Sequence, residues 1–282
     1  MKGINVMSIK MIAVDMDGTF LNDHNTYDHE RFSKLFGYLK QRGIHFVAAS
    51  GSQFQRLQLQ FAPFKNDIDY ISQNGSLVHC GEQLAFTAPI QIADYLDLLR
   101  KLEVNFAKND LVMKTISGIN YTYAEESLPA KYFEIIKRYY SSVKRVPSLK
   151  KLASLGDKDQ LIKVGVTFAP NIDFEKASTK LRSLLPATLS SLNSGFSTQL
   201  VGTANIDKRT GIKYLQEKYQ IRTDEIMTFG DNENDIGMLE LTPYSFAMSN
   251  AAAKIKSKAA NITSCDNNNS GVLETLEKVL MK

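Results

Sequence analysis

Cysteine is scarce in this chain of 282 residues, which contains only Cys80 and Cys265. Two cysteines cannot build the disulfide framework of small secreted domains and suit a reducing compartment, so we expect a cytoplasmic protein. We expect no membrane span, because no stretch reaches the roughly 18 consecutive apolar residues that a spanning helix needs. Met1 to Lys10 lack the apolar core and the cleavage site of a signal peptide. For residues 1–9 two alternatives stay open, a disordered tail or a short extension of the first strand.

A strong charge of either sign is missing as well. The 34 lysines and arginines against 30 aspartates and glutamates leave a formal charge of +4, which is too small to indicate a nucleic-acid partner. The four histidines form no metal-binding pattern, and the composition, 43% hydrophobic and 23% charged, is that of an ordinary globular protein. The length suits one large or two medium domains, at roughly 100–200 residues each.

The first third of the chain alternates short apolar strands with amphipathic helices. Strands are expected at Met11–Val14, Ile44–Ala49 and Tyr70–Ser72, with helices at Tyr27–Arg42 and Gln53–Phe61 between them. Continuous apolar strands joined by helices predict a parallel, doubly wound sheet that is buried on both faces. Ligands of such sheets bind at the carboxyl ends of the strands, so polar residues there are candidates for function.

The middle of the chain follows a different pattern. Pro89–Leu102 is typical of an amphipathic helix, Leu111–Tyr123 of a hairpin, and Leu161–Phe168 alternates like a strand with one solvated face. These features predict an antiparallel α+β unit inserted into the α/β domain. The α/β pattern then resumes with a helix at Thr210–Tyr219 and a strand at Ile226–Phe229.

Two carboxylates, Asp15 and Asp17, stand at the exit of the first apolar strand. Residues two apart in a regular strand share a face, so these like charges would lie side by side and favour a hard cation such as Mg2+. Gly18 lets the backbone turn and present N–H groups to an anion. Such a pair can supply the nucleophile and the proton donor that hydrolysis of a phosphate ester needs. The alternative is structural, with Asp17 as a turn residue and Asp15 as a cap.

A second acidic pair, Asp231 and Asp235, follows the strand at Ile226–Phe229. Their spacing is about one helical turn, so both carboxylates can face one ion if a helix begins there. The alternative is an N-terminal capping cluster, because Asp and Asn favour helix starts. Two acidic strand ends in one sheet nevertheless indicate a bound cation.

Three weaker signals accompany the acidic pairs. Ser50 and Gly51 offer a hydroxyl and a backbone N–H at a strand end, which form either an anion site or merely a turn. Lys208 stands at a predicted helix start, where its charge opposes the helix dipole, so its partner is either an outside anion or solvent. Asn74, before Gly75, marks either an ordinary turn or a functional loop.

Taken in order, four motifs resemble those of the haloacid dehalogenase superfamily: Asp15–Thr19, Ser50-Gly51, Lys208 and Gly230–Asp235. The Asn74-Gly75 turn and the insertion between the second and third motifs are similar to its Cof-type branch, whose large α/β cap is of the C2B type. The resemblance covers nearly the whole chain. It implies a Rossmann-like, doubly wound parallel-sheet core, residues 1–83 and 202–282, and an inserted α+β cap domain, residues 84–201.

The resemblance also implies a Mg2+-dependent phosphatase that hydrolyses small phosphorylated metabolites, sugar phosphates or similar, through an aspartyl-phosphate. Asp15 is similar in position to the nucleophile and Asp17 to the general acid and base. The implied metal ligands are Asp15, the main-chain carbonyl of Asp17, Asp231 and, directly or through water, Asp235. The implied phosphate-binding groups are the N–H groups of Met16 and Asp17 together with Ser50, Gly51, Lys208 and Asn234, while Asn74 would orient the substrate.

The chain departs from this resemblance at Ser52, where relatives usually carry the arginine of a Thr-Gly-Arg motif. The change removes a bidentate group at the rim that faces the cap, so substrate preference does not carry over. Two other functions stay open. One is a phosphomutase or phosphotransferase, which passes the phosphate to a second hydroxyl, and the other is a non-catalytic sugar-phosphate sensor. Neither the metabolite nor the oligomeric state can be read from the sequence.

Overall fold

The computed structural model describes residues 9–195 and 197–281. The choice between a tail and a strand extension at residues 1–8 lies outside these ranges. The chain divides into two compact units, and each has its own sheet and its own hydrophobic core. The units are a core, Met1–Thr87 with Asp207–Lys282, and a cap, Ala88–Ile206.

The predicted borders of the cap, residues 84 and 201, cut through two strands, β5 (Gln83–Thr87) and β11 (Thr198–Thr203). β5 pairs with its neighbour in the core sheet, so the core continues to the end of this strand. β11 pairs with two strands of the cap sheet, so its last residues stay in the cap. Both borders therefore lie a few residues further along the chain than predicted.

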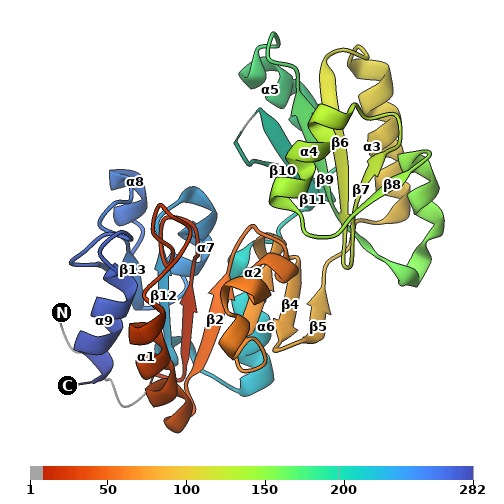
Figure 1. Cartoon of the computed structure of the whole chain (residues 1–282). Coiled ribbons are helices and arrows are strands. Elements are labelled where there is room, and N and C mark those ends of the chain that lie inside the picture. Colours follow the sequence, from red (N-terminus) through yellow and green to blue (C-terminus); the bar gives the residue numbers. More distant parts are fainter. Residues whose placement is uncertain (1–8, 196, 282) are drawn as a thin grey trace. The chain divides into compact units, whose positions relative to one another are not determined.

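The core is organised around a sheet with the strand order β14-β13-β12-β1-β2-β3-β4-β5 (Figure 1). The strands from β14 to β3 pair in parallel, as predicted, whereas β4 and β5 are antiparallel additions at one edge that the sequence pattern did not suggest. The remaining core strands are β1 (Met11–Val14), β2 (His45–Ala49), β3 (Asp69–Ser72), β4 (Leu77–Cys80), β12 (Ile226–Gly230), β13 (Tyr244–Ala247) and β14 (Asn261–Ile262).

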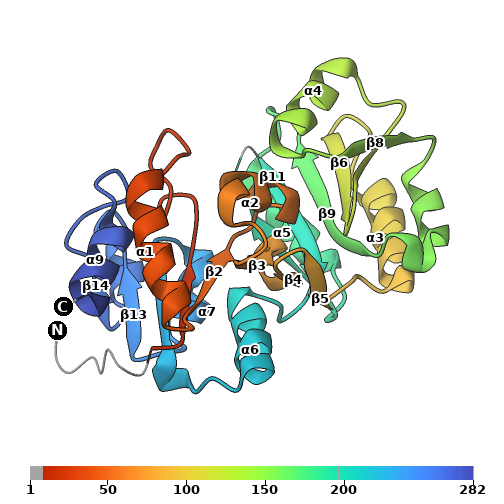
Figure 2. The same ribbon diagram turned by 60° about the horizontal axis from the view of Figure 1, so that its bottom comes forward.

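Helices cover both faces of the core sheet, which explains why its central strands are apolar throughout (Figure 2). Ile12 and Val14 of β1 belong to the cluster formed with α1, α2 and α9, whereas Met11 and Ala13 belong to the cluster formed with α6 and α7. The core helices are α1 (His29–Gln41), α2 (Phe54–Gln60), α6 (Lys208–Tyr219), α7 (Ile236–Leu239), α8 (Ala253–Lys256) and α9 (Gly271–Leu280).

The cap contains a second sheet, with the strand order β10-β11-β9-β6-β7-β8, in which only β7 and β8 pair in parallel. Side chains of α3 and α5 pack on one face of this sheet, against Val164 and Val166 of β9. The cap elements not yet given are α3 (Ile92–Asn105), β6 (Leu111–Gly118), β7 (Thr122–Glu125), α4 (Ala130–Tyr139), β8 (Val143–Val146), β9 (Leu161–Phe168), α5 (Phe174–Leu184) and β10 (Leu189–Asn193).

The prediction of one solvated face for β9 is wrong. Residues 161–166 and Phe168 are buried, and only Thr167 is partly exposed. The side of β9 away from α3 and α5 carries Lys163, Gly165 and Thr167, and side chains of the neighbouring strand β6 lie against it. The alternating pattern therefore distinguished two faces correctly, but the polar face is not open to water.

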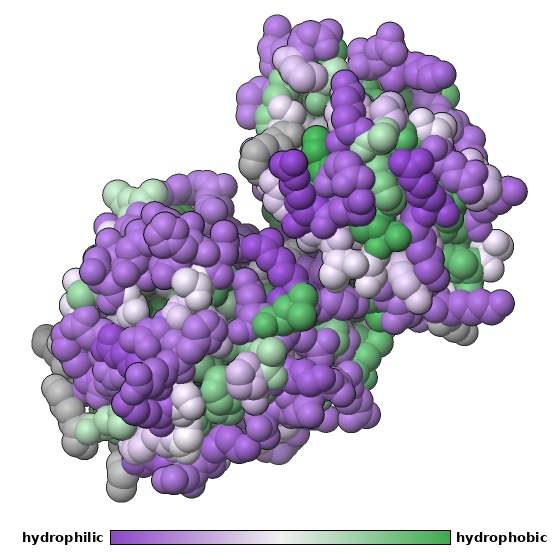
Figure 3. Space-filling view, in the orientation of Figure 1, coloured by the Kyte–Doolittle hydropathy of each residue, from purple (hydrophilic) through white to green (hydrophobic). Residues whose placement is uncertain are grey.

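Hydrophilic residues prevail on the face of the molecule shown in Figure 3. The large apolar side chains that are exposed include Leu59 on α2 and Val104 on α3. None of the helices in the described part of the chain has the length and apolar character that crossing a bilayer requires.

Candidate active site

The carboxyl ends of β2, β1 and β12 meet at one edge of the core sheet, because these strands are parallel neighbours. Asp15 directly follows β1, and its N–H donates to the carbonyl of Phe229 at 3.0 Å, so the sheet ladder positions its backbone. Gly18 then has a φ of +80°, and a Cβ there would lie 2.6 Å from Oδ2 of Asp231. A glycine is therefore needed for the loop to pass this close to the second acidic strand end.

Lys208, the first residue of α6, places its ammonium between two carboxylates. Its Nζ donates to Oδ1 of Asp15 and, at 2.7 Å, to Oδ1 of Asp235, and all three residues are buried. Burial favours the neutral amine, but the two carboxylates outweigh burial and raise the pKa of Lys208. The observed partners of the lysine are thus two carboxylates of the chain itself, whereas the sequence argument had considered an outside anion or solvent.

Asp235 combines the two alternatives that the sequence left open. Its Oδ2 accepts the N–H groups of Asp231 at 2.9 Å and of Asn232 at 3.0 Å, as a capping residue does. Its Oδ1 accepts from Lys208, so the same carboxylate also belongs to the charged cluster. Asp235 ends the short 3-10 helix η7 (Glu233–Asp235), which continues into α7.

Three carboxylates form a group that could hold a metal ion. One oxygen each from Asp15, Asp231 and Asp235 lies within 4.8 Å of the others. Burial raises the pKa of Asp15 well above its usual range, the charge of Asp235 adds to this, and Lys208 only partly offsets it. Burial also raises the pKa of Asp231. The hydrogen bond that Thr19 donates to Asp231 at 2.8 Å lowers this pKa but does not cancel the effect of burial. Three carboxylates beside one ammonium leave surplus negative charge, which a cation would neutralise.

Backbone N–H groups next to this cluster are available to an anion. Among the described residues, no hydrogen bond takes up the N–H of Met16, Asp17 or Gly51. Clustered N–H groups of this kind at the end of a strand bind phosphate and other oxyanions. The hydroxyl of Ser50, predicted to bind phosphate, accepts the N–H of Ser52 at 3.0 Å.

The loop after β3 joins the site through Asn74, which has a left-handed φ of 54°. Its Oδ1 accepts from Nδ2 of Asn234 at 3.1 Å, and its carboxamide lies against the backbone of Gly51. At Gly75 a Cβ would lie 1.9 Å from the carbonyl oxygen of Asp207, the residue that caps α6 just before Lys208. The structure thus brings the predicted acidic, phosphate-binding and substrate-orienting residues to one edge of the core.

Asp17 differs from the other acidic residues because its side chain is 54% exposed. Its Oδ1 lies 3.5 Å from the guanidinium of Arg56 on α2, a residue that the sequence argument did not single out. The sequence signal that could have identified Arg56 is its position one helical turn after Ser52. Ser52 stands where the resembled motif has an arginine. An exposed carboxylate beside Asp15 is well placed to exchange protons with a bound molecule.

Two further supporting residues escaped the sequence argument. Thr19 orients Asp231, and Asn250 donates its Nδ2 to the carbonyl of Gly18 at 2.8 Å, which braces the loop after β1. Thr19 lies within the first motif and could have been suspected from that position. Asn250 had no local signal, since it follows β13 and meets Gly18 only through the fold.

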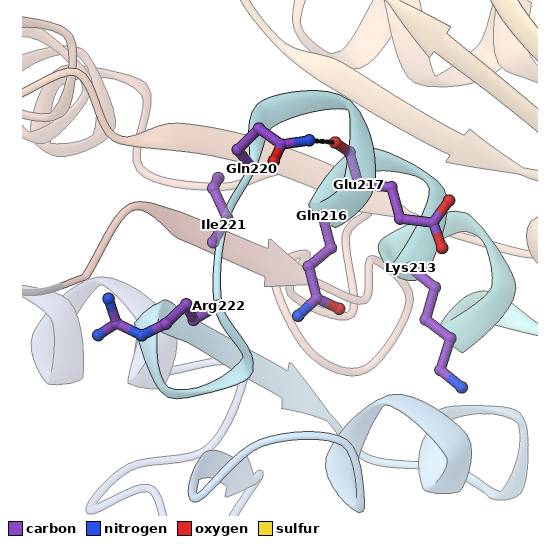
Figure 4. Close-up of a pocket in the computed structure, with 6 residues that line it drawn as sticks. All are labelled: Lys213, Gln216, Glu217, Gln220, Ile221 and Arg222. Atoms are coloured by element: carbon purple, nitrogen blue, oxygen red, sulfur yellow. Dashed lines mark hydrogen bonds between the residues drawn. The ribbon is translucent and has the colours of Figure 1, made fainter.

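A surface hollow at the other end of α6 is separate from this site. Glu217, in the last turn of α6, and Gln220, the C-cap of this helix, are among the residues that line it (Figure 4). Lys208 begins the same helix, so the two features lie at its opposite ends. The hollow is lined by Lys213, Gln216, Glu217, Gln220, Ile221 and Arg222.

The comparisons with known proteins identify the chain as a phosphatase of the haloacid dehalogenase type. The chain matches the haloacid dehalogenase-like hydrolase family over residues 12–276 and belongs to that family. It is 30% identical over 274 residues to the Escherichia coli 5-amino-6-(5-phospho-D-ribitylamino)uracil phosphatase YbjI, covering 97% of both chains. It is 26% identical to the putative phosphatase YxeH of Bacillus subtilis, covering 96% of this chain and 98% of YxeH. The crystal structure of SMU.1108c from Streptococcus mutans superposes with a TM-score of 0.83 at 26% identity, covering 98% of this chain and 100% of that one.

Proposed function

We propose that this phosphatase is Mg2+-dependent and hydrolyses small phosphorylated metabolites through an aspartyl-phosphate on Asp15. The observation that carries the proposal is the position of Asp15, which contacts Lys208, lies in a group with Asp231 and Asp235, and adjoins open N–H groups. The donor set fits the ion, because Mg2+ prefers carboxylate, carbonyl and water oxygens over nitrogen or sulfur ligands. Bound there by Asp15, the Asp17 carbonyl, Asp231 and Asp235, it would neutralise charge on the carboxylates and on the phosphate.

In the proposed reaction, different residues of the chain bind the phosphate, attack phosphorus and transfer protons. The N–H groups of Met16, Asp17 and Gly51 would bind the phosphate oxygens, with Ser50, Lys208 and Asn234 beside them. A carboxylate oxygen of Asp15 attacks phosphorus, and the bond to the leaving oxygen breaks as Asp17 donates a proton to that oxygen. Asp17 afterwards accepts a proton from the water that hydrolyses the aspartyl-phosphate. Its exposed side chain supports this role, since the leaving group and the water must both reach it.

For the substrate we propose 5-amino-6-(5-phospho-D-ribitylamino)uracil, the compound named for the E. coli relative YbjI. The proposal rests on 30% identity along nearly the full length of both chains. The compound is a phosphate ester of a sugar alcohol and belongs to the class of small phosphorylated metabolites expected from the sequence. We also propose a cytoplasmic location and no nucleic-acid or membrane partner, supported by the two cysteines and the small net charge of +4.

The test is phosphate release from this compound and from a panel of sugar phosphates, with Mg2+ and with EDTA. We expect turnover only with Mg2+, and its loss in Asp15→Asn, which replaces the attacking oxygen but keeps the shape. Asp67→Asn is the matched control, because Asp67 is exposed and its carboxylate forms a surface ion pair with Lys40. Full activity of Asp15→Asn, or equal activity in EDTA, would contradict the proposal.

A further inference from the structure

An asparagine-rich turn, residues 266–270, precedes α9 and contacts the loop that follows β1. Asn267 of this turn is buried, with 6% of the residue exposed. Its Nδ2 donates to the carbonyl of Leu21 at 3.0 Å and to Oδ1 of Asp23 at 3.2 Å. A carboxamide nitrogen has two hydrogens to donate, and here both bonds reach the same loop. Asn267 therefore ties the loop after β1 to the C-terminal part of the chain.

Two further asparagines extend this contact. Nδ2 of Asn268 donates to Oδ2 of Asp23 at 3.0 Å, and the N–H of Asp23 donates back to Oδ1 of Asn268 at 3.0 Å. Asn250, after β13, uses both ends of its carboxamide. Its Nδ2 donates to the carbonyl of Gly18 at 2.8 Å, and its Oδ1 accepts the N–H of Asn267 at 3.3 Å. We call Asn250, Asn267 and Asn268 together the asparagine brace.

The backbone that the asparagine brace holds is the backbone that carries Asp17. Gly18 directly follows Asp17, and Leu21 pairs with Asp17 in an isolated β-bridge. The side chain of Asp17 is 54% exposed, and its 3.5 Å contact with Arg56 is too long and too exposed to fix it in place. The position of its carboxylate therefore depends on the backbone. A misplacement of about 1 Å can lower a reaction rate about a hundredfold, so this dependence matters for catalysis.

The inner side of the same loop is anchored by other contacts. Phe20 is buried, and the centroid of its ring lies 5.2 Å from that of Phe32 and 5.6 Å from that of Phe46. These aromatic contacts do not involve the asparagine brace. Loss of one hydrogen bond of the brace should therefore shift the loop and Asp17 without detaching the loop from the core.

We propose that the asparagine brace positions Asp17 for proton transfer, with Asn267 as its central residue. Asn267 acts through Leu21 and Asp23, so it is a positioning residue and not a catalytic one. The inference rests on the proposed function, because it needs Asp17 as the group that donates a proton to the leaving oxygen. Cutting the brace should impair this protonation more than the attack on phosphorus, since the sheet ladder holds the backbone of Asp15 separately.

The experiment compares two esters that differ in their need for a proton. In 5-amino-6-(5-phospho-D-ribitylamino)uracil the leaving group is an alkoxide, which must be protonated as it departs, whereas 4-nitrophenyl phosphate releases a stable anion. Single-turnover reactions with excess enzyme and Mg2+ measure the release of each leaving group before the aspartyl-phosphate is hydrolysed. A smaller folded fraction would affect both esters alike, so a difference between the esters reports on Asp17.

The main variant is Asn267→Asp, which removes the donor Nδ2 and places a second carboxylate next to Asp23. It should slow the uracil compound about tenfold or more and 4-nitrophenyl phosphate less than about threefold, because a general acid contributes about 10²–10⁴ to a rate. Adding Asp23→Asn should restore at least about threefold of the rate with the uracil compound, since the new amide can donate to the new carboxylate. Its oxygen can still accept from Asn268.

The matched control is Asn269→Asp. Asn269 is an exposed residue of the same turn, and its Nδ2 donates to Oδ1 of Asp266 at 2.8 Å, within the turn. This variant also places a carboxylate next to an aspartate, but the loop after β1 is not involved. Both rates should stay within about twofold of the wild type, as is usual for a surface substitution.

Equal slowing of both esters by Asn267→Asp, or slowing of neither, overturns the inference. If circular dichroism shows that Asn267→Asp is unfolded, Asn250→Ala decides in the same way, because it removes the bond to the Gly18 carbonyl without burying a charge. Failure of the proposed function is a separate result, in which Asp17→Asn itself slows both esters alike, and the inference then falls with it. If Asp17→Asn distinguishes the esters and the brace variant does not, the inference alone is wrong.

Discussion

Lys208→Met tests how the charged cluster of the core is balanced. The lysine is fully buried, and its ammonium is hydrogen-bonded to Asp15 and Asp235, whose side chains are 8% and 0% exposed. Methionine has a similar length, so the change removes the charge with little change in packing volume. It leaves two buried carboxylates without their cation, a loss that typically costs about 3–5 kcal/mol. Single domains are stable by only about 5–15 kcal/mol, so the effect should be large.

The assay is urea unfolding in EDTA, with hydrogen exchange of peptides from β1 and α6 to identify the transition of the core. Peptide-level exchange is needed because the chain has two compact units that can unfold separately. Lys213→Met is the matched control, since Lys213 is an exposed lysine of the same helix and its loss should cost under about 0.5 kcal/mol.

A double variant sharpens this test. Asp15→Asn removes one of the two unpaired carboxylates, so Asp15→Asn with Lys208→Met should be less destabilised than the sum of the single changes. A loss below about 1 kcal/mol for Lys208→Met, or strict additivity in the double variant, would refute the electrostatic account given for this cluster.

Three further predictions concern other parts of the chain. The pKa of Lys163 is lowered from 10.5 to about 8, so the unfolded chain holds a proton that the folded chain releases between these pH values. The wild type should therefore gain up to about 3 kcal/mol of unfolding free energy across that range, and Lys163→Met should lack this rise in urea titrations. Arg56→Met should lower kcat/KM less than about tenfold in steady-state assays, because its contact with Asp17 is long and partly exposed. Gly75→Ala should lower the unfolding free energy by about 2 kcal/mol or more in the same urea titrations, because the new Cβ would strike the Asp207 carbonyl and φ is 90°.

Each of these predictions has an outcome that contradicts it. Parallel pH profiles for the wild type and the Lys163 variant would mean that the lysine keeps its ordinary pKa in the fold. A hundredfold loss in the Arg56 variant would require a direct role in the reaction that its observed contact does not explain. An unchanged unfolding free energy for the Gly75 variant would mean that the loop after β3 can move away from the start of α6.

The local patterns of the sequence carried much of the architecture. Uninterrupted apolar runs such as Met11–Val14 predicted buried parallel strands, and both faces of β1 are indeed covered by helices. The two antiparallel edge strands β4 and β5 were not predicted; in the structure β4 is largely buried, whereas β5 is exposed or partly exposed throughout. The edge of a sheet depends on what lies beside it, which a local pattern does not record.

In the candidate site, too, some features could be predicted from local sequence and others depend on the fold. Asp15, Asp17, Asp231 and Asp235 could be chosen from the sequence, since two acidic pairs after apolar strands of one α/β pattern together indicate a cation, although each pair alone also fits a turn or a cap. The contacts that site residues make with one another could not be derived in this way. Asp15 meets Lys208 across 193 positions and Asn74 meets Asn234 across 160, and such distant pairs are formed only when the sheet assembles.

Lys163 illustrates what the fold alone decides. Its position in an alternating strand predicted a solvated face, because the pattern records that a face is polar and not what covers it. In the folded cap that face carries hydroxyl side chains and two glycines, and the lysine is buried among them. The sequence by itself thus determined the chemistry available at each strand end, through residue type and local period. The tertiary structure decided which of these groups are charged neighbours, which are buried and which remain open to a ligand, because these properties depend on contacts between distant segments.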